Sequence, residues 1–395
     1  MTPYTIMNYY PNYDILDNIV SRKNYEKLNL FIDLKNTIQS VYMEHCIKHL
    51  VDSTEKSKYI DTSVFASLIP FLAFHKLYAA KRGIDVNFYI FFETGESYYH
   101  KNINKQYKKS RKLDNLYGLD HAQRQKFTEI LHANYKLIDK ALNKIPDTKV
   151  IKLQNLEADF IPYYLITRNK VDPNAANIIY SNDHDMWQCV TDNTFIYSKT
   201  AGKVKNIIEE GKPIKRLLKN EHTELSDPIV PLAMSVMGDS GDDISGIKGI
   251  GPKTFEKIGS DLLDLVGGMD QLRENIVKRR KVFDDTVISN CPNKNLRKVV
   301  ESELNYNTIS NNMKQIDFEI ISRFIEDPIN TSMLEFKKYI DSIISDDNIS
   351  SFDSLRRALI LNRVFLQEEH LELLYWRKSQ GSVIGSSEHF DESSV

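Results

Sequence analysis

Cysteine is scarce in this sequence, and long apolar runs are missing. The 395 residues include three cysteines, Cys46, Cys189 and Cys291, which lie far apart and are odd in number. This spacing argues against a disulfide framework and a zinc site, and it suits a reducing cytosol. The most apolar stretch, residues 65–74, is interrupted by Pro70 and is far shorter than the roughly 20 residues that cross a bilayer. The polar N-terminus is unlike a signal peptide. We therefore expect a cytoplasmic protein without a membrane partner.

A net positive charge is also missing, since the formal charge is −2. The charges are distributed unevenly, however, and local charge decides whether a surface binds phosphate. Residues 98–112 hold no acid and six cations, and a second basic run covers 278–281; the six are Lys101, Lys105, Lys108, Lys109, Arg111 and Lys112. Both segments are candidate phosphate-binding surfaces, although most charge runs are solvated helical faces.

Short β-rich runs alternate with stretches long enough for helices. The runs are residues 28–34, 86–92, 149–153, 177–181 and 194–197, and the helical stretches are 64–82, 122–143 and 158–168. This alternation predicts an α/β fold with a mainly parallel, doubly wound sheet. Active sites of such sheets lie at the carboxyl ends of the strands. Asp33, Glu93 and Asp183 stand at or near those ends, which is the first functional signal.

Further acids come in close pairs. Asp183 and Asp185 are two apart after an extended run, so we expect both to point to one side. Asp239 and Asp242 are three apart, which predicts neighbours on one helical face, and Glu157 and Asp159 open a predicted helix. Clustered carboxylates need cations, and oxygen-only ligation suits Mg²⁺. Two such ions about 4 Å apart stabilise the attacking and leaving oxygens of a phosphodiester. Taken singly, each acid is more simply a helix cap or a surface charge.

A Gly-rich turn occupies residues 247–254, where Gly249, Gly251, Lys253 and Thr254 lie between two predicted short helices. Exposed N–H groups at a helix start bind phosphate. Pro252 stands where a Walker loop requires lysine, which excludes a nucleotide-dependent ATPase. A plain helix–helix connection remains equally open. In the basic segment, Tyr98, Tyr99 and Tyr107 are interleaved with the cations, and aromatic rings stack on unpaired bases.

Residues 238–254 closely resemble the metal-binding and helix–three-turn–helix signature of the 5′-nuclease (flap endonuclease-like) family. The likeness in pattern is greatest to bacteriophage RNase H enzymes and 5′-to-3′ exonucleases. Other segments resemble family motifs in the same order: residues 30–33, 92–93, 107–111, 156–159, 181–188 (ending with Gln188) and 314–318.

The resemblance implies a PIN-like fold with a helical arch and two bound Mg²⁺ ions, with Mn²⁺ able to replace them. It assigns Asp33, Glu93, Glu157 and Asp159 to the first metal, and Asp183, Asp185, Asp239 and Asp242 to the second. The resemblance also assigns the catalytic contacts with the scissile phosphate to Lys108 and Arg111. Nucleic-acid binding falls to Tyr107, Lys109, Lys112, Gly249, Gly251, Lys253 and Thr254.

The implied activity is that of a 5′-to-3′ exonuclease, RNase H or flap endonuclease. Its expected substrate is DNA or an RNA–DNA hybrid with a 5′ end or flap, as in primer removal during phage replication in the host cytoplasm. A single-strand-binding protein or sliding clamp is an expected partner of a monomer. The expected organisation is an N-terminal extension (1–27), a nuclease core (28–230) with an arch near 98–145, a clamp (231–300), a helical region (301–380) and a disordered tail (381–395).

The sequence departs from the family pattern at three places. Glu93 stands where aspartate is typical, Phe160 replaces a second aspartate, and Leu34-Lys35 follows Asp33 where many members have Gly-Asn. These changes keep an alternative open, in which the protein is a catalytically impaired nucleic-acid-binding accessory protein of replication.

Overall fold

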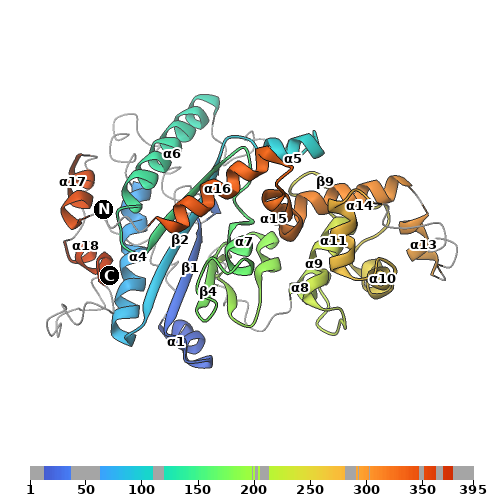
Figure 1. Cartoon of the computed structure of the whole chain (residues 1–395), viewed down its shortest axis with the longest axis horizontal. Coiled ribbons are helices and arrows are strands. Elements are labelled where there is room, and N and C mark those ends of the chain that lie inside the picture. Colours follow the sequence, from blue (N-terminus) through green and yellow to red (C-terminus); the bar gives the residue numbers. More distant parts are fainter. Residues whose placement is uncertain are drawn as a thin grey trace.

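The computed structural model describes residues 13–36, 63–109, 120–197, 199–200, 203–204, 213–280, 291, 293–301, 303–346, 351–361 and 368–376 (Figure 1). Arg111, Lys112 and the predicted tail 381–395 lie outside these residues. Within the described part of the chain, no helix has both the length and the apolar character that crossing a membrane requires.

Five parallel strands form the central sheet, in the order β3-β2-β1-β4-β5. Their bounds agree with the predicted runs: β1 Lys27–Asp33, β2 Asp85–Thr94, β3 Thr148–Gln154, β4 Ala176–Tyr180 and β5 Thr194–Tyr197. The predicted α/β class with a parallel sheet is confirmed. Parallel pairing brings all the carboxyl ends to one edge, where Asp33 of β1 is paired with Phe91 and Glu93 of β2 with Leu153.

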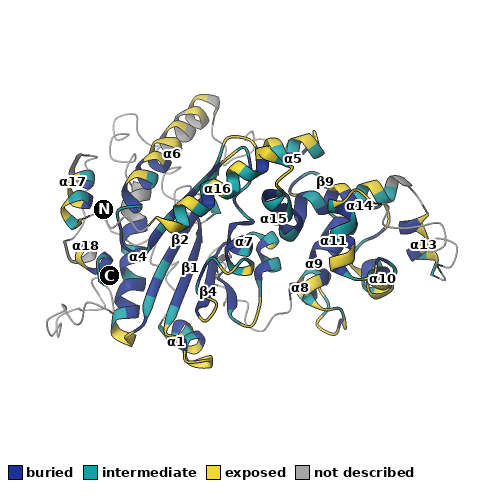
Figure 2. Ribbon diagram, in the orientation of Figure 1, coloured by how far each residue is buried: buried dark blue, intermediate teal, exposed yellow. Residues whose placement is uncertain are grey.

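Alternate residues of the strands belong to two different cores, and Figure 2 shows strands of the sheet as largely buried. Leu30 and Ile32 of β1 belong to the core that contains α4 (Ser63–Arg82) and α6 (His121–Leu142). Phe31 belongs to the opposite core, with α7 (Ile161–Thr167), α15 (Phe318–Glu326) and α16 (Thr331–Ser345). Helices therefore cover both faces, as a doubly wound sheet requires.

The N-terminal extension contains a helix that its weak pattern does not predict. Helix α1 (Tyr13–Arg22) buries Leu16 and Ile19 completely in the first core. The C-terminal helices α17 (Phe352–Leu361) and α18 (Glu368–Leu374) pack into the same core. The ammonium of buried Lys76 on α4 donates to the carbonyl of Trp376, which ties the end of the described chain to the sheet.

A third core belongs to the helical part drawn in yellow and orange in Figure 1. It is formed by α8 (Pro213–Leu218), α9 (Val230–Met237), α10 (Pro252–Leu265), α11 (Met269–Val277), α13 (Lys294–Val300) and α14 (Glu303–Ile316). Short elements complete the described chain: α5 (Tyr98–Ile103), η3 (His184–Cys189), η4 (Asp227–Ile229), β6 (Lys199–Thr200), β7 (Lys203–Val204), β8 (Gly238–Asp239) and β9 (Ile244–Ser245).

Candidate active site

The predicted acids of the first two strands lie where β1 and β2 end. Asp33 is the last residue of β1 and is 6% exposed; its carboxylate accepts hydrogen bonds from the Ser181 hydroxyl (2.8 Å) and the Asn36 N–H (3.0 Å). Burial raises the pKa of Asp33 to about 7, and the charges of Glu93 and Asp183 act in the same direction. Glu93 forms an ion pair with Lys35, one of the residues in which the sequence departs from the family pattern.

Glu157 and Asp159 follow β3 in the turn that leads to α7. The helix begins at Ile161, so neither acid opens it, which corrects the prediction. Loss of hydration raises the pKa of Asp159 well above its ordinary value, and Glu157 and Glu93 raise it further. Electrostatic coupling of this kind requires the acids to lie close together, so the ends of β2 and β3 share one site.

Asp183 and Asp185 follow strand β4, as predicted; the backbone of Asp183 is extended, and Asp185 lies in the first turn of the 3-10 helix η3. Asp183 caps this helix, and its side chain accepts a hydrogen bond from the N–H of Asp185 (3.0 Å). Burial raises the pKa of Asp185 well above its ordinary value, with contributions from Asp183, Asp242 and Asp239. The two pairs of acids assigned to the second metal are therefore close enough for their charges to repel one another.

Asp239 and Asp242 lie in a tight β8–β9 hairpin, not on a helical face as predicted. Close approach of two backbone segments forms this hairpin, because a Cβ added at Gly246 would lie 2.1 Å from the carbonyl oxygen of Met237. The carboxylate of Asp242 is 5% exposed and accepts a hydrogen bond from the Tyr107 hydroxyl (3.0 Å). Glycine is thus required for a turn that places a buried acid in the site.

Lys108 is the cation of this cluster. Its ammonium lies 2.6 Å from each carboxylate oxygen of Glu157 and 3.4 Å from Asp242. Its backbone has a positive φ of 54°, and its N–H donates to the carbonyl of Asp242 (3.1 Å). Burial acts to raise the pKa of Glu157, but the charges of Lys108 and His100, together with the hydrogen bonds from Lys108 and Tyr107, more than offset this and lower it to about 2.

Part of this cluster borders an open pocket of about 560 Å³ at the carboxyl edge of the sheet, whereas Asp185, Asp239 and Asp242 are not among its lining residues. Its lining residues include Asp33, Glu93, Glu157, Asp159, Asp183, Lys35, Tyr107, Lys108 and Lys109. A second hollow of about 590 Å³ lies at the opposite edge, where the ion pairs Lys23–Asp192 and Lys27–Asp172 lie. Carboxylates whose pKa is raised by burial, Asp33 and Asp159, distinguish the first pocket, whereas the pKa of Asp172 in the second hollow is lowered.

The donor chemistry of the site suits hard divalent cations. Oxygen Oδ1 of Asp185 is buried and has no hydrogen-bond partner among the described residues. Repulsion between buried carboxylates is what a divalent cation relieves. As the side chains stand in the described chain, no three His, Cys, Asp or Glu residues surround a common point as metal ligands do. Ammonium groups balance the charge of several of these carboxylates: Lys108 forms ion pairs with Glu157 and Asp242, and Lys35 forms one with Glu93.

Tyr107 is not available to stack on a base, contrary to the prediction. It is 4% exposed, and its hydroxyl donates to Glu157 (2.9 Å) as well as to Asp242. Its ring stacks on His100 at 4.6 Å. No local pattern marks His100, and none marks the Ser181 hydroxyl as a partner of Asp33, although Ser181 directly follows β4. Tyr98 is 59% exposed and is free of such packing, while Lys109 is exposed beside the pocket.

The predicted phosphate-binding turn lies apart from this pocket. The hairpin β8–β9, not a helix, directly precedes the turn, which corrects one part of the prediction. The turn leads into α10, whose N-cap is Gly251. Gly249 and Lys253 are exposed, Gly249 has a φ of 85°, and Thr254 is half-buried. The four residues therefore form a surface at a helix start, as a phosphate-binding turn requires.

Residues 30–216 match the family described as 5′-3′ exonuclease, N-terminal resolvase-like domain. A 5′-3′ exonuclease of Aquifex aeolicus (strain VF5) is 26% identical over 173 residues, which are 44% of this chain and 54% of that relative. A 5′-3′ exonuclease of Mycoplasma pneumoniae is 29% identical over 177 residues, or 43% of this chain and 55% of the relative. The match thus spans about half the length of these curated relatives.

The fold is similar to that of a bacteriophage T5 flap endonuclease, solved as a pseudo-enzyme–product complex with DNA and metal ions. The TM-score is 0.52 at 17% identity, over 81% of this chain and 100% of that one. A T5 5′-exonuclease solved with bound zinc gives a TM-score of 0.50 with the same coverage. The fold and the sequence match agree, and residues 30–216 are similar to the N-terminal domain of the 5′-3′ exonucleases.

Proposed function

We propose that this protein is a divalent-metal-dependent phosphodiesterase that cuts DNA or RNA–DNA hybrids near a 5′ end or flap. The observation that carries this proposal is the meeting of carboxylates from separate segments of the chain at one edge of the sheet, beside Lys108. The family match of residues 30–216 supports it.

The eight acids are the proposed ligands of two Mg²⁺ ions, with Mn²⁺ able to replace them. Asp33, Glu93, Glu157 and Asp159 would hold one ion, and Asp183, Asp185, Asp239 and Asp242 the other. When bound, such ions activate water and stabilise the charge on a phosphodiester. Hydrolysis in this way leaves a 3′-hydroxyl and a 5′-phosphate without a covalent intermediate.

The chain's own residues have separable tasks. Lys108 exchanges its carboxylate partners for the scissile phosphate, whose developing charge it stabilises together with Arg111. Tyr107 orients Glu157 and Asp242 by donating its hydroxyl hydrogen bond. Gly249, Gly251, Lys253 and Thr254 bind the backbone of the duplex beside the cut, and Lys109 and Lys112 contact phosphates at the arch.

A role in primer removal during phage replication fits such an activity, with RNase H and flap cleavage as two forms of one reaction. We propose a monomer that works with a single-strand-binding protein or a sliding clamp. A non-cutting accessory protein is the second candidate. It is favoured by Phe160, which is 1% exposed in the core and supplies no ligand, and by the pairing of Glu93 with Lys35.

Incubation of purified protein with 5′-flap DNA and with an RNA–DNA hybrid, in Mg²⁺ and in Mn²⁺, separates these candidates. The nuclease cleaves at least one substrate, and Asp239→Asn abolishes cleavage while the labelled substrate still binds. Binding without cleavage in either metal supports the accessory protein, and absence of binding rejects both. Substrates that differ only in a 5′ RNA or DNA segment then define the preference.

A further inference from the structure

The turn between α14 and α15 is bonded to several parts of the molecule at once. We call residues Lys314–Phe318, which lie in one of the segments that resemble family motifs, the α14–α15 junction. Among the described residues, no hydrogen bond or ion pair joins it to the proposed ligands of the metal. Each of its five residues nevertheless forms a hydrogen bond or an ion pair with another segment: α5, η3 or α11.

Gln188 connects the junction to the acids of η3. Its side-chain N–H donates to the carbonyl of Ile316 (2.8 Å), and its side-chain oxygen accepts from the N–H of Phe318 (3.2 Å). Both ends of the amide are used, so a carboxylate or a shorter amide cannot replace it. Since Gln188 lies on the 3-10 helix that holds Asp185 and is capped by Asp183, the junction fixes where that helix lies.

Two carbonyls of the junction hold α5. The hydroxyl of Tyr99 donates to the carbonyl of Lys314 (2.7 Å), and the imidazole of His100 bonds to the carbonyl of Gln315 (3.1 Å). The other ring nitrogen of His100 bonds to the Ser97 hydroxyl (2.7 Å). Because the ring of His100 stacks on Tyr107, the junction also supports the hydroxyl that binds Glu157 and Asp242.

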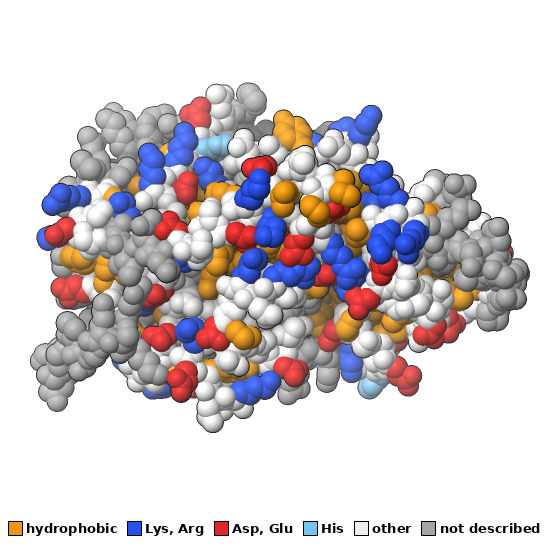
Figure 3. Space-filling view, in the orientation of Figure 1, with side chains coloured by type: hydrophobic (Ala, Val, Ile, Leu, Met, Phe, Trp, Pro, Cys, Tyr) orange, Lys and Arg blue, Asp and Glu red, His pale blue; other side chains and the backbone are white. Residues whose placement is uncertain are grey.

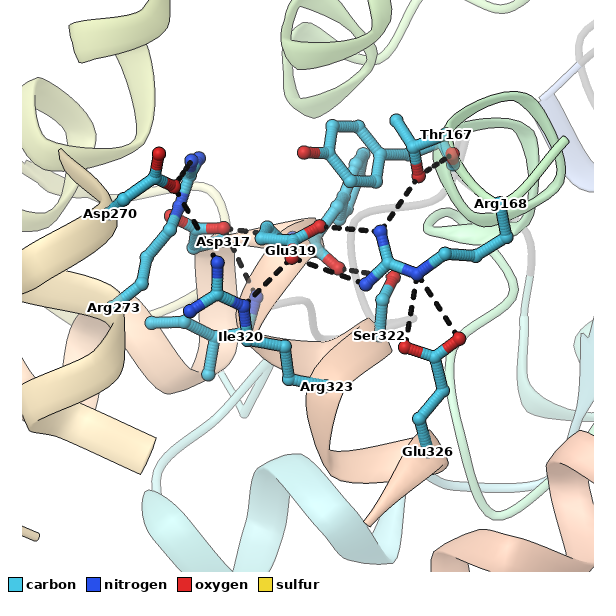
Figure 4. A network of polar contacts seen from close by, with 12 residues as sticks. Thr167, Arg168, Asp270, Arg273, Asp317, Glu319, Ile320, Ser322, Arg323 and Glu326 are labelled. Atoms are coloured by element: carbon cyan, nitrogen blue, oxygen red, sulfur yellow. Dashed lines mark hydrogen bonds and ion pairs between the residues drawn. The ribbon is translucent and has the colours of Figure 1, made fainter. Parts of the chain in front are cut away.

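Asp317 connects the junction to the helical part with the Gly-rich turn. This residue is fully buried; it caps α15 and accepts a hydrogen bond from the guanidinium of Arg273 on α11 (2.8 Å, Figure 4). Helix α11 leads directly into the basic run at Lys278. A buried ion pair of this kind is costly to break from one side.

The surrounding ion pairs also fix α15 to the end of helix α7. Arg168 at the end of α7 contacts Glu319 (2.8 Å) and Glu326 (3.0 Å) of α15 (Figure 4). Figure 3 shows Lys and Arg side chains among acidic ones over the middle of this face, where Figure 1 places α7, α15 and α16. The junction therefore lies between α7 on one side and α11 of the helical part on the other.

We propose that the α14–α15 junction sets the duplex-binding helices in register with the catalytic carboxylates, through Arg273–Asp317 on one side and Gln188 on the other. This inference rests on the proposed function. Binding of duplex at the turn 247–254 then changes the position of η3. As a result, the cut falls at a fixed distance from the duplex end. Arg273, Asp317 and Gln188 are positioning residues that touch no substrate.

Trp187 provides a readout that needs no cleavage. It lies next to Gln188 on η3, with its ring 4.4 Å from that of His184. With Trp376→Phe as the common background, its fluorescence is followed while duplex DNA is added in EDTA. We expect duplex to change the emission of the parent. We expect Asp317→Asn, Arg273→Gln and Gln188→Ala to bind labelled duplex within about threefold of the parent but to lose most of this response.

Matched variants separate positioning from general stability. Asp317→Asn keeps a side-chain oxygen that caps α15, and Arg273→Lys keeps the buried charge, so at least one variant on that side is expected to fold. Asp341→Asn is the control. It removes a carboxylate of α16 that pairs with Lys170 and Lys337 (both 2.6 Å) and makes no contact with the junction. The control retains the parental Trp187 response.

Cleavage of an end-labelled flap completes the test. The parent yields one dominant product, whereas the positioning variants cut at several neighbouring phosphates, with kcat about tenfold lower and KM unchanged. Parental product patterns together with a parental Trp187 response would overturn the inference, as would a parent whose Trp187 ignores bound duplex. If the parent binds duplex but cuts nothing, the proposed function fails, and the fluorescence alone decides the inference.

Discussion

Lys108 places its ammonium 2.6 Å from both carboxylate oxygens of Glu157, inside the pocket where the metal ligands are proposed. A single side chain therefore serves as the counter-charge of the carboxylates and is also the candidate that contacts the phosphate. The ammonium cannot pair with the carboxylates and contact the phosphate at the same time. In the proposed reaction, cations and substrate therefore displace Lys108 from Glu157 and Asp242.

Replacing Lys108 by methionine should tighten divalent-metal binding while it depresses cleavage. Loss of a competing positive charge should raise the affinity for Mn²⁺ by about tenfold. Loss of the phosphate contact should lower the turnover number by about 100-fold. Mn²⁺ binding is measured by electron paramagnetic resonance without nucleic acid. Lys109→Met, which removes an exposed lysine of the same pocket, should leave Mn²⁺ affinity nearly unchanged. Weaker Mn²⁺ binding by Lys108→Met contradicts this account.

Asp159→Asn should stabilise the metal-free protein and abolish cleavage. Its pKa is raised by burial and by neighbouring acids, so removing the charge relieves repulsion by about 1 kcal/mol. Urea unfolding in EDTA measures the change. Asp172→Asn is a control with the opposite expected sign. The Asn174 N–H and the Lys27 ion pair lower the pKa of Asp172, so removal of this carboxylate should slightly destabilise the protein. Destabilisation by Asp159→Asn would show that the acids do not repel one another.

Gly249→Ala should cost about 1–2 kcal/mol, whereas Gly251→Ala should be nearly neutral for stability. A Cβ has open space at both positions, but Gly249 has a φ of 85° and Gly251 a φ of −114°. The difference therefore isolates backbone strain in the phosphate-binding turn. Thermal unfolding provides the measurement, and equal destabilisation by the two variants would refute the assigned backbone geometry.

Stability should fall as the pH drops below about 6.5, and His75 should contribute to this loss. Burial lowers the pKa of His75 to about 4, from an ordinary value of 6.5. The neutral ring bonds to the Phe71 carbonyl (2.8 Å) and the Tyr180 hydroxyl (2.6 Å). The unfolded chain takes up a proton first, so the contribution of His75 is complete above pH 6.5 and declines by roughly 3 kcal/mol down to pH 4.

His75→Gln provides the comparison for this pH dependence. Unfolding free energies of the parent and the variant are measured by urea titration from pH 7.5 to pH 4. The difference between them should shrink as the pH falls, because only the parent loses the contribution of a neutral imidazole. A constant difference over this range would mean that His75 titrates normally in the folded protein.

The sheet and most of its acids follow from local sequence patterns. Short, continuous apolar runs mark the strands, which are buried along most of their length. The carboxyl ends of parallel strands share an edge, so the sequence alone places Asp33 and Glu93 there. The hairpin that holds Asp239 and Asp242 has no comparable local signal, because it depends on the contact between Gly246 and the backbone of Met237. Local spacing therefore suggested a helix there.

Local sequence patterns also do not predict contacts between residues that are distant in the sequence. The sequence marked Lys108 as a phosphate contact, but its carboxylate partners become apparent only when residues 49 and 134 positions away are folded beside it. Tyr107 looked like a base-stacking residue, and burial against His100 gives it a different role. Helix α1 was missed because Leu16 and Ile19 are a weak pattern until the core they fill is known.

The position of bound cations tests the central claim most directly. Crystals grown with Mn²⁺ should show two anomalous-scattering peaks roughly 4 Å apart in the pocket, with Glu157, Asp159, Asp183 and Asp185 turned toward them and Lys108 displaced. Peaks elsewhere, or a pocket in which Lys108 still pairs with Glu157 at saturating Mn²⁺, would contradict the account.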